Sequence, residues 1–185
     1  MTVAHALALL AALIVAGCVS TNEEPFPLDD GVALSPAAKG YVCDTFDVRG
    51  HRQVAAKEAR LLALRRNKKT HYAFIDAEKA SAEPFTLHEA SGDLDIAAVA
   101  HTEGPGEDLY LVEVTDAGKA FRLYAESADF PSRAQSVAQN HGVTLTHNPI
   151  TNDLAGPASG QKAFMIDMAA KPAAWTVVAE CRAKK

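Results

Sequence analysis

The chain lacks the motifs by which common catalytic sites are recognised in a sequence. It has no Gly-x-Ser-x-Gly turn for a nucleophilic serine, because the segment Gly156–Gly160 carries its glycines at the wrong offsets. It also has no phosphate-binding glycine loop and no His-Glu-x-x-His zinc motif. Neither Cys43 nor Cys181 has a second cysteine or a histidine at zinc-ligand spacing. The sequence therefore predicts a protein that is not an enzyme and has no cofactor and no metal site.

Positive charge is missing from the amino-terminal end, and the apolar run there is short. The first residues read MTVAHALALLAALIVAGC, and Thr2 to His5 supply no Lys or Arg where a signal peptide carries its charged region. A helix needs about 20 apolar residues to span a bilayer, so this run falls short of a transmembrane segment. Its length is typical of the apolar region of a signal peptide.

Small residues precede the first cysteine of the chain, in the tetrapeptide Val15-Ala16-Gly17-Cys18. This tetrapeptide resembles the lipobox of bacterial lipoproteins, which implies a signal peptide over 1–17 and a lipidated Cys18 at the new amino terminus. Val19 is not the Asp that resembles an inner-membrane retention signal. The resemblance therefore implies a lipid anchor in the outer membrane, with the protein facing the periplasm. Secretion without lipid and an uncleaved anchor are the alternatives.

The two remaining cysteines fit the same compartment. With Cys18 lipidated, Cys43 and Cys181 form an even pair near the two ends of the expected domain, in a compartment that permits disulfides. A disulfide between them would remove roughly 5 kcal/mol of unfolded-state freedom in the chain-entropy model. Two buried free thiols are the alternative interpretation.

The mature chain divides into a polar segment and one domain. Residues 18–39 contain three prolines, four acidic residues and few large apolar ones, and they are expected to form a flexible tether of roughly 25 Å. Residues 40–185 have the length of a single globular domain with a proper core.

Alternating apolar residues predict antiparallel strands through the middle of that domain. The ranges 94–100 and 110–114 flank the turn at 104–106 and are expected to pair. Residues 116–118, Asp-Ala-Gly, are expected to form a three-residue hairpin loop that leads into a strand over 121–125.

One helix is marked by its ends. Ser132 and Gln135 have the spacing of a capping box, and Gly142 stands where a left-handed residue would end the helix. A short strand over 143–146 should follow. The fold class is therefore α+β, with a mainly antiparallel sheet, a meander that resembles a barrel in its curl, and one or two helices.

Two segments leave a choice between helix and strand. Range 52–66 fits either a hairpin with 72–75 or the end of a helix that starts near Arg52. Range 162–170 alternates at Phe164, Ile166 and Met168, which favours a closing hairpin with the strand that leads to Cys181, and a helix is the alternative.

Acidic residues and histidines offer a weaker hint of chemistry. Asp93 and Asp95 together could hold a cation, although two acids on a solvated sheet face are the simpler interpretation. His101 would lie roughly 20 Å from Asp95 along a straight strand, too far to share a proton or a metal. His141 falls at the end of the expected helix, where an imidazole can cap it.

Basic charge gathers in one segment of an otherwise acidic chain. Residues 49–69 hold eight basic residues and one acidic residue, a local charge of +7 against a net charge of −5 for the whole chain. Such a segment could rest on anionic headgroups or lipopolysaccharide phosphate, and a solvated face is the alternative. Nucleic acid is not expected as a partner of an exported, acidic chain. The residues expected to contact an anionic surface are Arg49, Arg52, Arg60, Arg65, Arg66, Lys68 and Lys69.

Short pieces of the domain resemble one known family. Tyr41-Val42-Cys43-Asp44, the late Cys181 and Ala158-Ser159-Gly160 are similar to pieces of the membrane-bound inhibitors of C-type lysozyme. That resemblance implies an antiparallel barrel, a disulfide from start to end, and a Ser-Gly loop that enters the lysozyme cleft. The chain departs from the pattern in its length, in the residues after Gly160 and in the spacing of the pieces.

Taken together, these features predict a non-catalytic, lipid-anchored cell-envelope protein with a disulfide-closed binding or structural domain. Its expected partners are the membrane, reached through the anchor, and either anionic headgroups or another envelope protein. A lysozyme inhibitor and a periplasmic hydrolase whose site residues lie far apart in the sequence are the alternatives.

Overall fold

The computed structural model describes residues 19–27, 31, 41–46, 52–66, 69–76, 84–101, 104–115, 118–148 and 151–183. Within those ranges the chain is rich in strands and holds two α-helices. The elements are β1 (Val19–Thr21), β2 (Tyr41–Phe46), β3 (Arg52–Arg66), β4 (Lys69–Asp76), β5 (Pro84–Ser91), β6 (Leu94–Ala100), β7 (Glu107–Thr115), β8 (Ala120–Glu126), α2 (Phe130–Asn140), β9 (Thr144–His147), β10 (Asn152–Ala155), α3 (Ala158–Ala169), the 3₁₀ helix η3 (Pro172–Ala174) and β11 (Trp175–Ala183).

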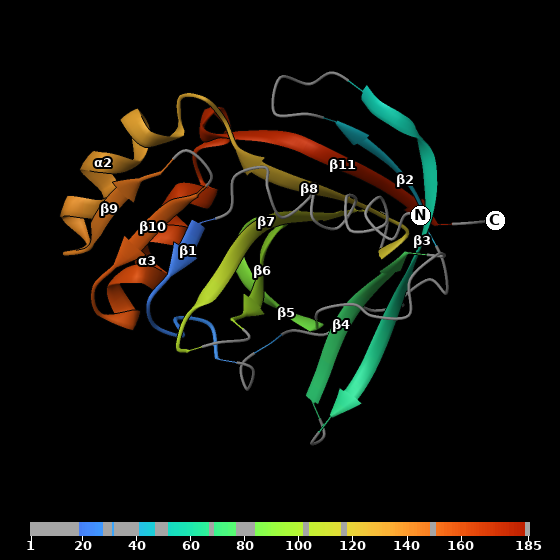
Figure 1. Ribbon diagram of the computed structural model, residues 1–185, viewed down its shortest axis with the longest axis horizontal. Helices are drawn as coiled ribbons and strands as arrows, with labels where there is room; N and C mark the ends of the chain where they lie inside the picture. The colour runs from blue at the N-terminus through green and yellow to red at the C-terminus, as the bar shows by residue number, and fades with distance from the viewer. Residues whose placement is uncertain are drawn as a thin grey trace, which may run out of the picture.

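The described strands form one curled sheet in the order β6-β5-β4-β3-β2-β11-β8-β7-β1-β10-β9, and β6 pairs with β7 as well (Figure 1). The ladder between β4 and β5 is short and consists of two residue pairs, Tyr72 with Phe85 and Ala73 with Pro84. The described pairings are antiparallel except that of β1 with β10. The α+β class is confirmed. The sheet is curled into a half-barrel, and it is mixed because β1 runs parallel to β10.

Opposite faces of β6 and β7 contribute to two different cores. Ile96 and Leu109 face a core that the helices cover, whereas Ala97 and Tyr110 face a second core that contains the bonded cysteines. Helices α2 and α3 gather at one end of the molecule with β9, β10 and β1, while β2, β3 and β4 lie at the other end (Figure 1). Because successive side chains point to opposite faces of a strand, both faces of β6 and β7 contribute to a buried core.

The hairpins expected in the middle of the domain are confirmed. Strands β6 and β7 pair antiparallel with Ala97 opposite Tyr110, and β7 pairs with β8. Gly118 has a φ of 82°, the left-handed conformation that the loop between β7 and β8 requires. Thr115 pairs with Ala120, so this loop spans the four positions 116–119 instead of the three expected. Segment 52–66 forms β3, which makes a hairpin with β4, so the hairpin alternative holds there. The short strand expected after Gly142 is β9.

The hairpin expected over 162–170 is wrong, because this segment lies in helix α3. Its buried residues are Gln161, Phe164, Met165, Met168 and Ala169, which recur with the helical period and pack on the helix-covered core. The alternation of Phe164, Ile166 and Met168 was a coincidence within this pattern.

The capping box expected at Ser132 is also wrong. Helix α2 begins at Phe130, with Asp129 as the N-cap residue and Pro131 in the first turn. Proline is favoured there because its ring fixes φ and its missing N–H would have no helical partner. The Ser132 hydroxyl instead donates to the Asp129 carbonyl oxygen. The expected stop is confirmed, since His141 caps the helix and Gly142 is left-handed with a φ of 64°.

The flexible tether expected over 18–39 is contradicted within 19–27. Val19–Thr21 form β1 between β7 and β10, and both Val19 and Phe26 are 0% exposed. The composition of the segment is poor in apolar residues, but its few apolar side chains enter the core and its backbone completes the sheet. Apart from Gly31, the rest of the expected tether lies outside the described residues.

A disulfide joins Cys43 of β2 to Cys181 of β11, as expected from the cysteine count. The two residues stand directly opposite each other in the antiparallel ladder and are 138 positions apart in the chain. This bond therefore links β2, near the start of the domain in the sequence, to β11, the last described strand of the chain.

The docking of 19–27 can be tested by truncating its most buried ring. We expect Phe26→Ala to lower the free energy of unfolding by about 3–5 kcal/mol, because it removes a fully buried aromatic side chain and leaves a cavity. Denaturant unfolding of the mature protein measures this. The exposed Glu23→Ala is the matched control, with an expected change within about 0.5 kcal/mol. Equal stability of the two variants would contradict the docking.

Candidate functional site

Among the described residues, the structure places the paired cysteines and the basic residues of the predicted site in separate regions. Cys18 lies outside the described residues, and its neighbour Val19 begins β1. Cys43 and Cys181 form the disulfide. Arg65, Arg66 and Lys69 stand at the tip of the β3–β4 hairpin, with Arg66 opposite Lys69. Arg52 and Arg60 lie further along β3, and Arg49 and Lys68 are outside the described residues.

The described part of the chain after Cys18 is held by buried polar contacts as well as by strand pairing. The Thr21 hydroxyl donates to the Glu107 carbonyl oxygen at 3.0 Å and accepts from the Glu107 N–H at 2.9 Å. The Phe26 N–H donates to the Glu107 carboxylate at 2.9 Å. We call Thr21, Phe26 and Glu107 the β1 clamp.

The β1 clamp encloses a carboxyl group that water barely reaches. Glu107 is 1% exposed, and burial raises its pKa to about 7, an effect that Glu24 reinforces. The Phe26 N–H and nearby His101 act in the opposite direction. Gly106, which precedes this residue, has a φ of 120°, and a Cβ there would lie 2.1 Å from the Thr21 carbonyl oxygen. Only glycine lets β1 approach this closely.

A serine, a histidine and an aspartate also meet at β1. The Nε2 atom of His101 lies 3.2 Å from the Ser20 hydroxyl and 3.1 Å from an Asp108 carboxylate oxygen. A catalytic triad needs the serine and the aspartate on opposite ring nitrogens, so that the ring can pass a proton between them. Here both partners share one nitrogen. The geometry suits a hydrogen-bonded tie between β1 and β7, and it does not suit nucleophile activation.

A second polar cluster lies where β1 meets β10. Asn152, opposite Val19 in the parallel ladder, donates its side-chain N–H to Glu126 at the end of β8, and its side-chain oxygen accepts from the His147 Nδ1 at 2.9 Å. Glu126 is 7% exposed, and burial raises its pKa to about 7, with Asp153 reinforcing the shift. One Glu126 oxygen, Oε1, has no hydrogen-bond partner among the described residues.

A third contact joins the same segment to helix α3. The Gln161 side chain donates to the Asn22 side-chain oxygen at 2.7 Å and to the Gly156 carbonyl oxygen at 2.5 Å. Its own oxygen, Oε1, is buried without a partner in the described part of the protein. Residues 20–22 therefore each contribute a side chain to a separate hydrogen-bonded group.

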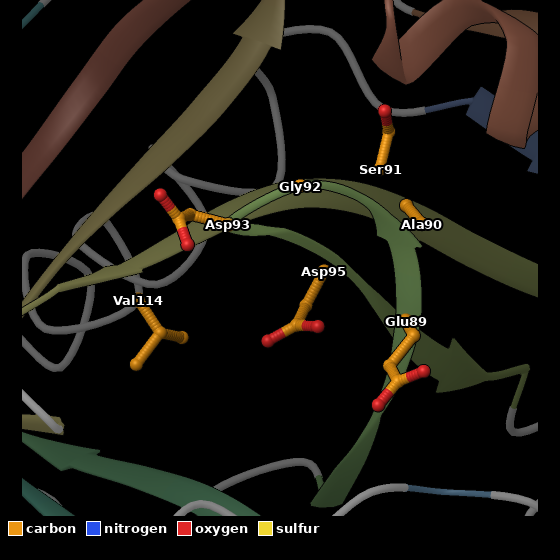
Figure 2. Close-up of a pocket in the computed structure, with 7 residues that line it drawn as sticks. All are labelled: Glu89, Ala90, Ser91, Gly92, Asp93, Asp95 and Val114. Carbon is orange, nitrogen blue, oxygen red and sulfur yellow. The ribbon is translucent and has the colours of Figure 1, made fainter.

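A concave feature of the described surface lies elsewhere, at the turn between β5 and β6. A pocket of about 290 Å³ is lined by Glu89, Asp93 and Asp95 with Val114 of β7. Glu89 and Asp95 are directly opposite in the ladder, and their carboxylates point into the pocket (Figure 2). Burial raises the pKa of Asp95 to about 6, and Glu89 adds to the effect. Asp93 is exposed, as expected for a solvated sheet face, whereas Asp95 is half-buried, which corrects that expectation for Asp95.

This acidic pocket can attract a positive charge but offers little to fix one. Like charges directly opposite in a ladder repel, and the repulsion by Glu89 adds to the effect of burial in raising the pKa of Asp95. The described residues contain no group of three His, Cys, Asp or Glu side chains that could hold a metal ion. His101 lies in the contact with Ser20 and Asp108 and is not among the residues that line the pocket.

The sequence pattern predicts the burial of some of these residues but not of others. Glu107 alternates with Leu109 and Leu111, so the strand period alone puts it on the helix-covered face. Glu126 follows Arg122 and Tyr124 on a face with polar groups, and its burial depends on β10 and β11. The lysozyme-inhibitor resemblance stays a prediction, and its piece Ala158-Ser159-Gly160 forms the first turn of α3.

Comparisons with protein-family models, with curated proteins and with solved structures found no match to this chain. Neither α2 nor α3, nor any other described helix, has the length and apolar character needed to cross a membrane. The function therefore has to be argued from the residues themselves.

The buried carboxyl groups predict how stability depends on pH. Because the pKa of Glu107 is raised from 4.5 to about 7, the folded state binds its proton more tightly than the unfolded state does. The resulting stabilisation is fully present below about pH 4.5 and is lost as the pH rises through 7. We expect Glu107→Gln, which mimics the protonated group, to be more stable relative to the native protein at pH 8 than at pH 5.5, by about 2 kcal/mol.

Denaturant unfolding at the two pH values measures this difference. Glu113→Gln is the control, because hydrogen bonds from Tyr124 and Arg122 lower the pKa of Glu113, which therefore stays ionised across this range. Its effect on stability should be the same at both pH values. An equally flat difference for Glu107→Gln would contradict the assigned burial of this carboxyl group.

Proposed function

We propose that this chain is a lipid-anchored protein of the bacterial cell envelope whose disulfide-closed domain has a binding or structural role rather than a catalytic one. The observation that carries the proposal is the small and apolar run that ends at Cys18, a pattern typical of a lipoprotein signal peptide. Cleavage before Cys18 would leave a mature chain whose first residue carries the lipid.

The use of the other cysteines supports the same compartment. Cys43 and Cys181 are bonded to each other, and disulfides persist in the periplasm but are rare in the cytosol. Val19 after the cysteine favours the outer membrane, with the domain facing the periplasm. All three cysteines of the chain then have an assigned use, which leaves no thiol for nucleophilic chemistry.

A non-catalytic role agrees with the geometry of the residues that could do chemistry. The Ser20, His101 and Asp108 side chains share one ring nitrogen, and the acidic pocket is lined by Glu89, Asp93 and Asp95 with no basic side chain or histidine among its lining residues. Neither arrangement provides a nucleophile with a base and an oriented partner. The domain therefore acts through its surface, and its partner is the membrane, an anionic headgroup or another envelope protein.

The tip of the β3–β4 hairpin is the surface we assign to anionic headgroups. Arg65, Arg66 and Lys69 come together there in the backbone ladder, with Lys68 between them in the sequence. Each basic residue near an anionic surface contributes about 1 kcal/mol at moderate salt. The sequence of this hairpin tip, residues 65–70, contains no acidic residue, in contrast to the acidic remainder of the chain.

Intact mass spectrometry of the protein extracted from membranes tests the anchor. We expect a mature chain that begins at Cys18 and carries acyl mass, and an increase on reduction equal to the two hydrogens lost in the Cys43–Cys181 bond. A Cys18→Ser variant should lack the acyl mass but keep the disulfide. An unprocessed native chain with free thiols would contradict the proposed compartment.

Charge reversal tests the hairpin tip. We expect Arg65→Glu with Arg66→Glu to weaken salt-dependent binding to phosphatidylglycerol vesicles about tenfold or more, because about 1 kcal/mol is lost with each charge. The protein is exported with a cleavable secretory leader in place of residues 1–18, so that no lipid masks the effect. Lys119→Glu with Arg133→Glu is the matched control, since it changes the net charge equally at exposed sites outside the hairpin. Equal weakening by both pairs would contradict the assignment.

A further inference from the structure

We infer that the mature protein has no spacer between its lipid and its fold, so that the membrane lies directly against the β9–β10 turn, on the side of the domain where β1 begins. This inference rests on the proposed lipidation of Cys18. It reverses the expectation of a tether of roughly 25 Å and gives the domain a fixed orientation on the bilayer surface.

Covalent geometry carries the first step. Consecutive Cα atoms lie 3.8 Å apart, so the Cα atom of Cys18 is within that distance of the Val19 Cα atom. Val19 is 0% exposed and is paired on both sides, with Leu109 of β7 and with Asn152 of β10. A lipid attached to Cys18 thus begins one residue away from a strand in the interior of the sheet.

The second step rests on the contacts of residues 21–26. These contacts hold β1 in the sheet, so the segment is not free to act as a spacer. Thr21 exchanges two hydrogen bonds with Glu107, Asn22 accepts from Gln161, and Phe26 is fully buried with its N–H bonded to the Glu107 carboxylate. Freeing 19–26 would expose the Phe26 ring and leave the buried Glu107 and Gln161 groups without these partners. Such losses cost several kcal/mol.

Strand register carries the third step, since it identifies the surface beside the anchor. In the parallel ladder Val19 lies beside Asn152, so the amino-terminal end of β1 lies at the same end of the sheet as the start of β10, which Thr151 precedes in the chain. Thr151 is joined to Asn148 by the turn between β9 and β10, and the Asn148 N–H donates to the Thr151 carbonyl oxygen at 2.9 Å. His147, next to Asn148, is exposed.

The chemistry of this turn fits the headgroup layer of a bilayer. Its described residues His147, Asn148 and Thr151 are polar hydrogen-bonding groups, and none is Lys, Arg, Asp or Glu. The Asn148 amide and the Thr151 hydroxyl donate to the Asp153 carboxylate, which holds the turn together, so the exposed His147 is the described side chain that can form hydrogen bonds in the headgroup layer. The other end of β9 follows Gly142 and the carboxyl end of α2. In this orientation the carboxyl end of α2 lies farther from the bilayer than the β9–β10 turn.

The test measures which residues touch the bilayer in the lipidated protein. The full chain carrying Asn148→Cys is processed in a bacterial host, extracted, labelled with a fluorophore and reconstituted into phosphatidylethanolamine–phosphatidylglycerol vesicles that contain a nitroxide-headgroup lipid. Asn140→Cys, an exposed asparagine at the end of α2, is the matched control. Thr146→Cys, also exposed, is a second reporter near the turn in case the Asn148 substitution disturbs folding.

We expect the label at position 148 to be quenched several-fold more than the label at position 140. A flexible linker of about 20 residues between Cys18 and Val19, which spans about 25 Å, should remove that difference. The linker begins with valine, so the residue after Cys18 is unchanged.

Mass spectrometry of the same samples separates the two claims. Equal quenching at positions 148 and 140 in protein whose Cys18 carries acyl mass would overturn the absence of a spacer while leaving the lipid anchor intact. A sample in which Cys18 carries no acyl mass would overturn the proposed function, and this inference with it.

Discussion

The insertion of β1 between β7 and β10 is the interaction on which the rest of this structure depends. Among the described strands, β10 pairs only with β1 and β9, and β9 pairs only with β10. In the strand ladder, β9 and β10 therefore join the curled part of the sheet through three residues, Val19 to Thr21. Hydrogen bonds from both neighbours and the burial of Val19 and Phe26 hold them in place. A segment that follows directly on an expected signal peptide thus becomes part of the fold.

Buried carboxyl groups lie on both sides of that junction. Glu107 belongs to the β1 clamp, and Glu126 bonds Asn152, which lies beside Val19. Burial raises the pKa of each to about 7, so both groups resist ionisation where β1 is held. Their desolvation opposes folding near neutral pH, while their hydrogen bonds fix the position of the chain that leads to the proposed lipid anchor. The burial of these two carboxyl groups therefore lowers the stability of the fold at neutral pH, but it holds the start of β1 in a defined position.

Local patterns in the sequence predicted the strands and turns that depend on near neighbours. The alternation in β6, β7 and β8 and the left-handed Gly118 and Gly142 had short-range signals. The bond between Cys43 and Cys181 was predicted from the cysteine count instead. Helix α3 was missed because Phe164, Ile166 and Met168 fit a period of two as well as a helical one. The start of α2 was missed because Pro131 and the buried Phe130 extend the helix past Ser132.

The junction at β1 could not be predicted from local patterns, because its partners are distant. Val19 pairs with Leu109 and Asn152, and Asn22 bonds Gln161 across 139 positions of the chain. Composition indicated disorder for 18–39, since composition does not record that a sheet elsewhere lacks a strand. Gly106 marked a turn in the sequence, and its second role, the close approach of β1, depends on the same tertiary contact.

Amide hydrogen exchange in the mature protein tests the central claim most directly, because it reports whether β1 is a strand in solution. The account predicts that the amides of Val19–Thr21 exchange as slowly as those of the paired residues in β7. Rapid exchange of Val19–Thr21, at the rate of an unstructured segment while β7 stays protected, would contradict it and restore a tether between the lipid and the fold.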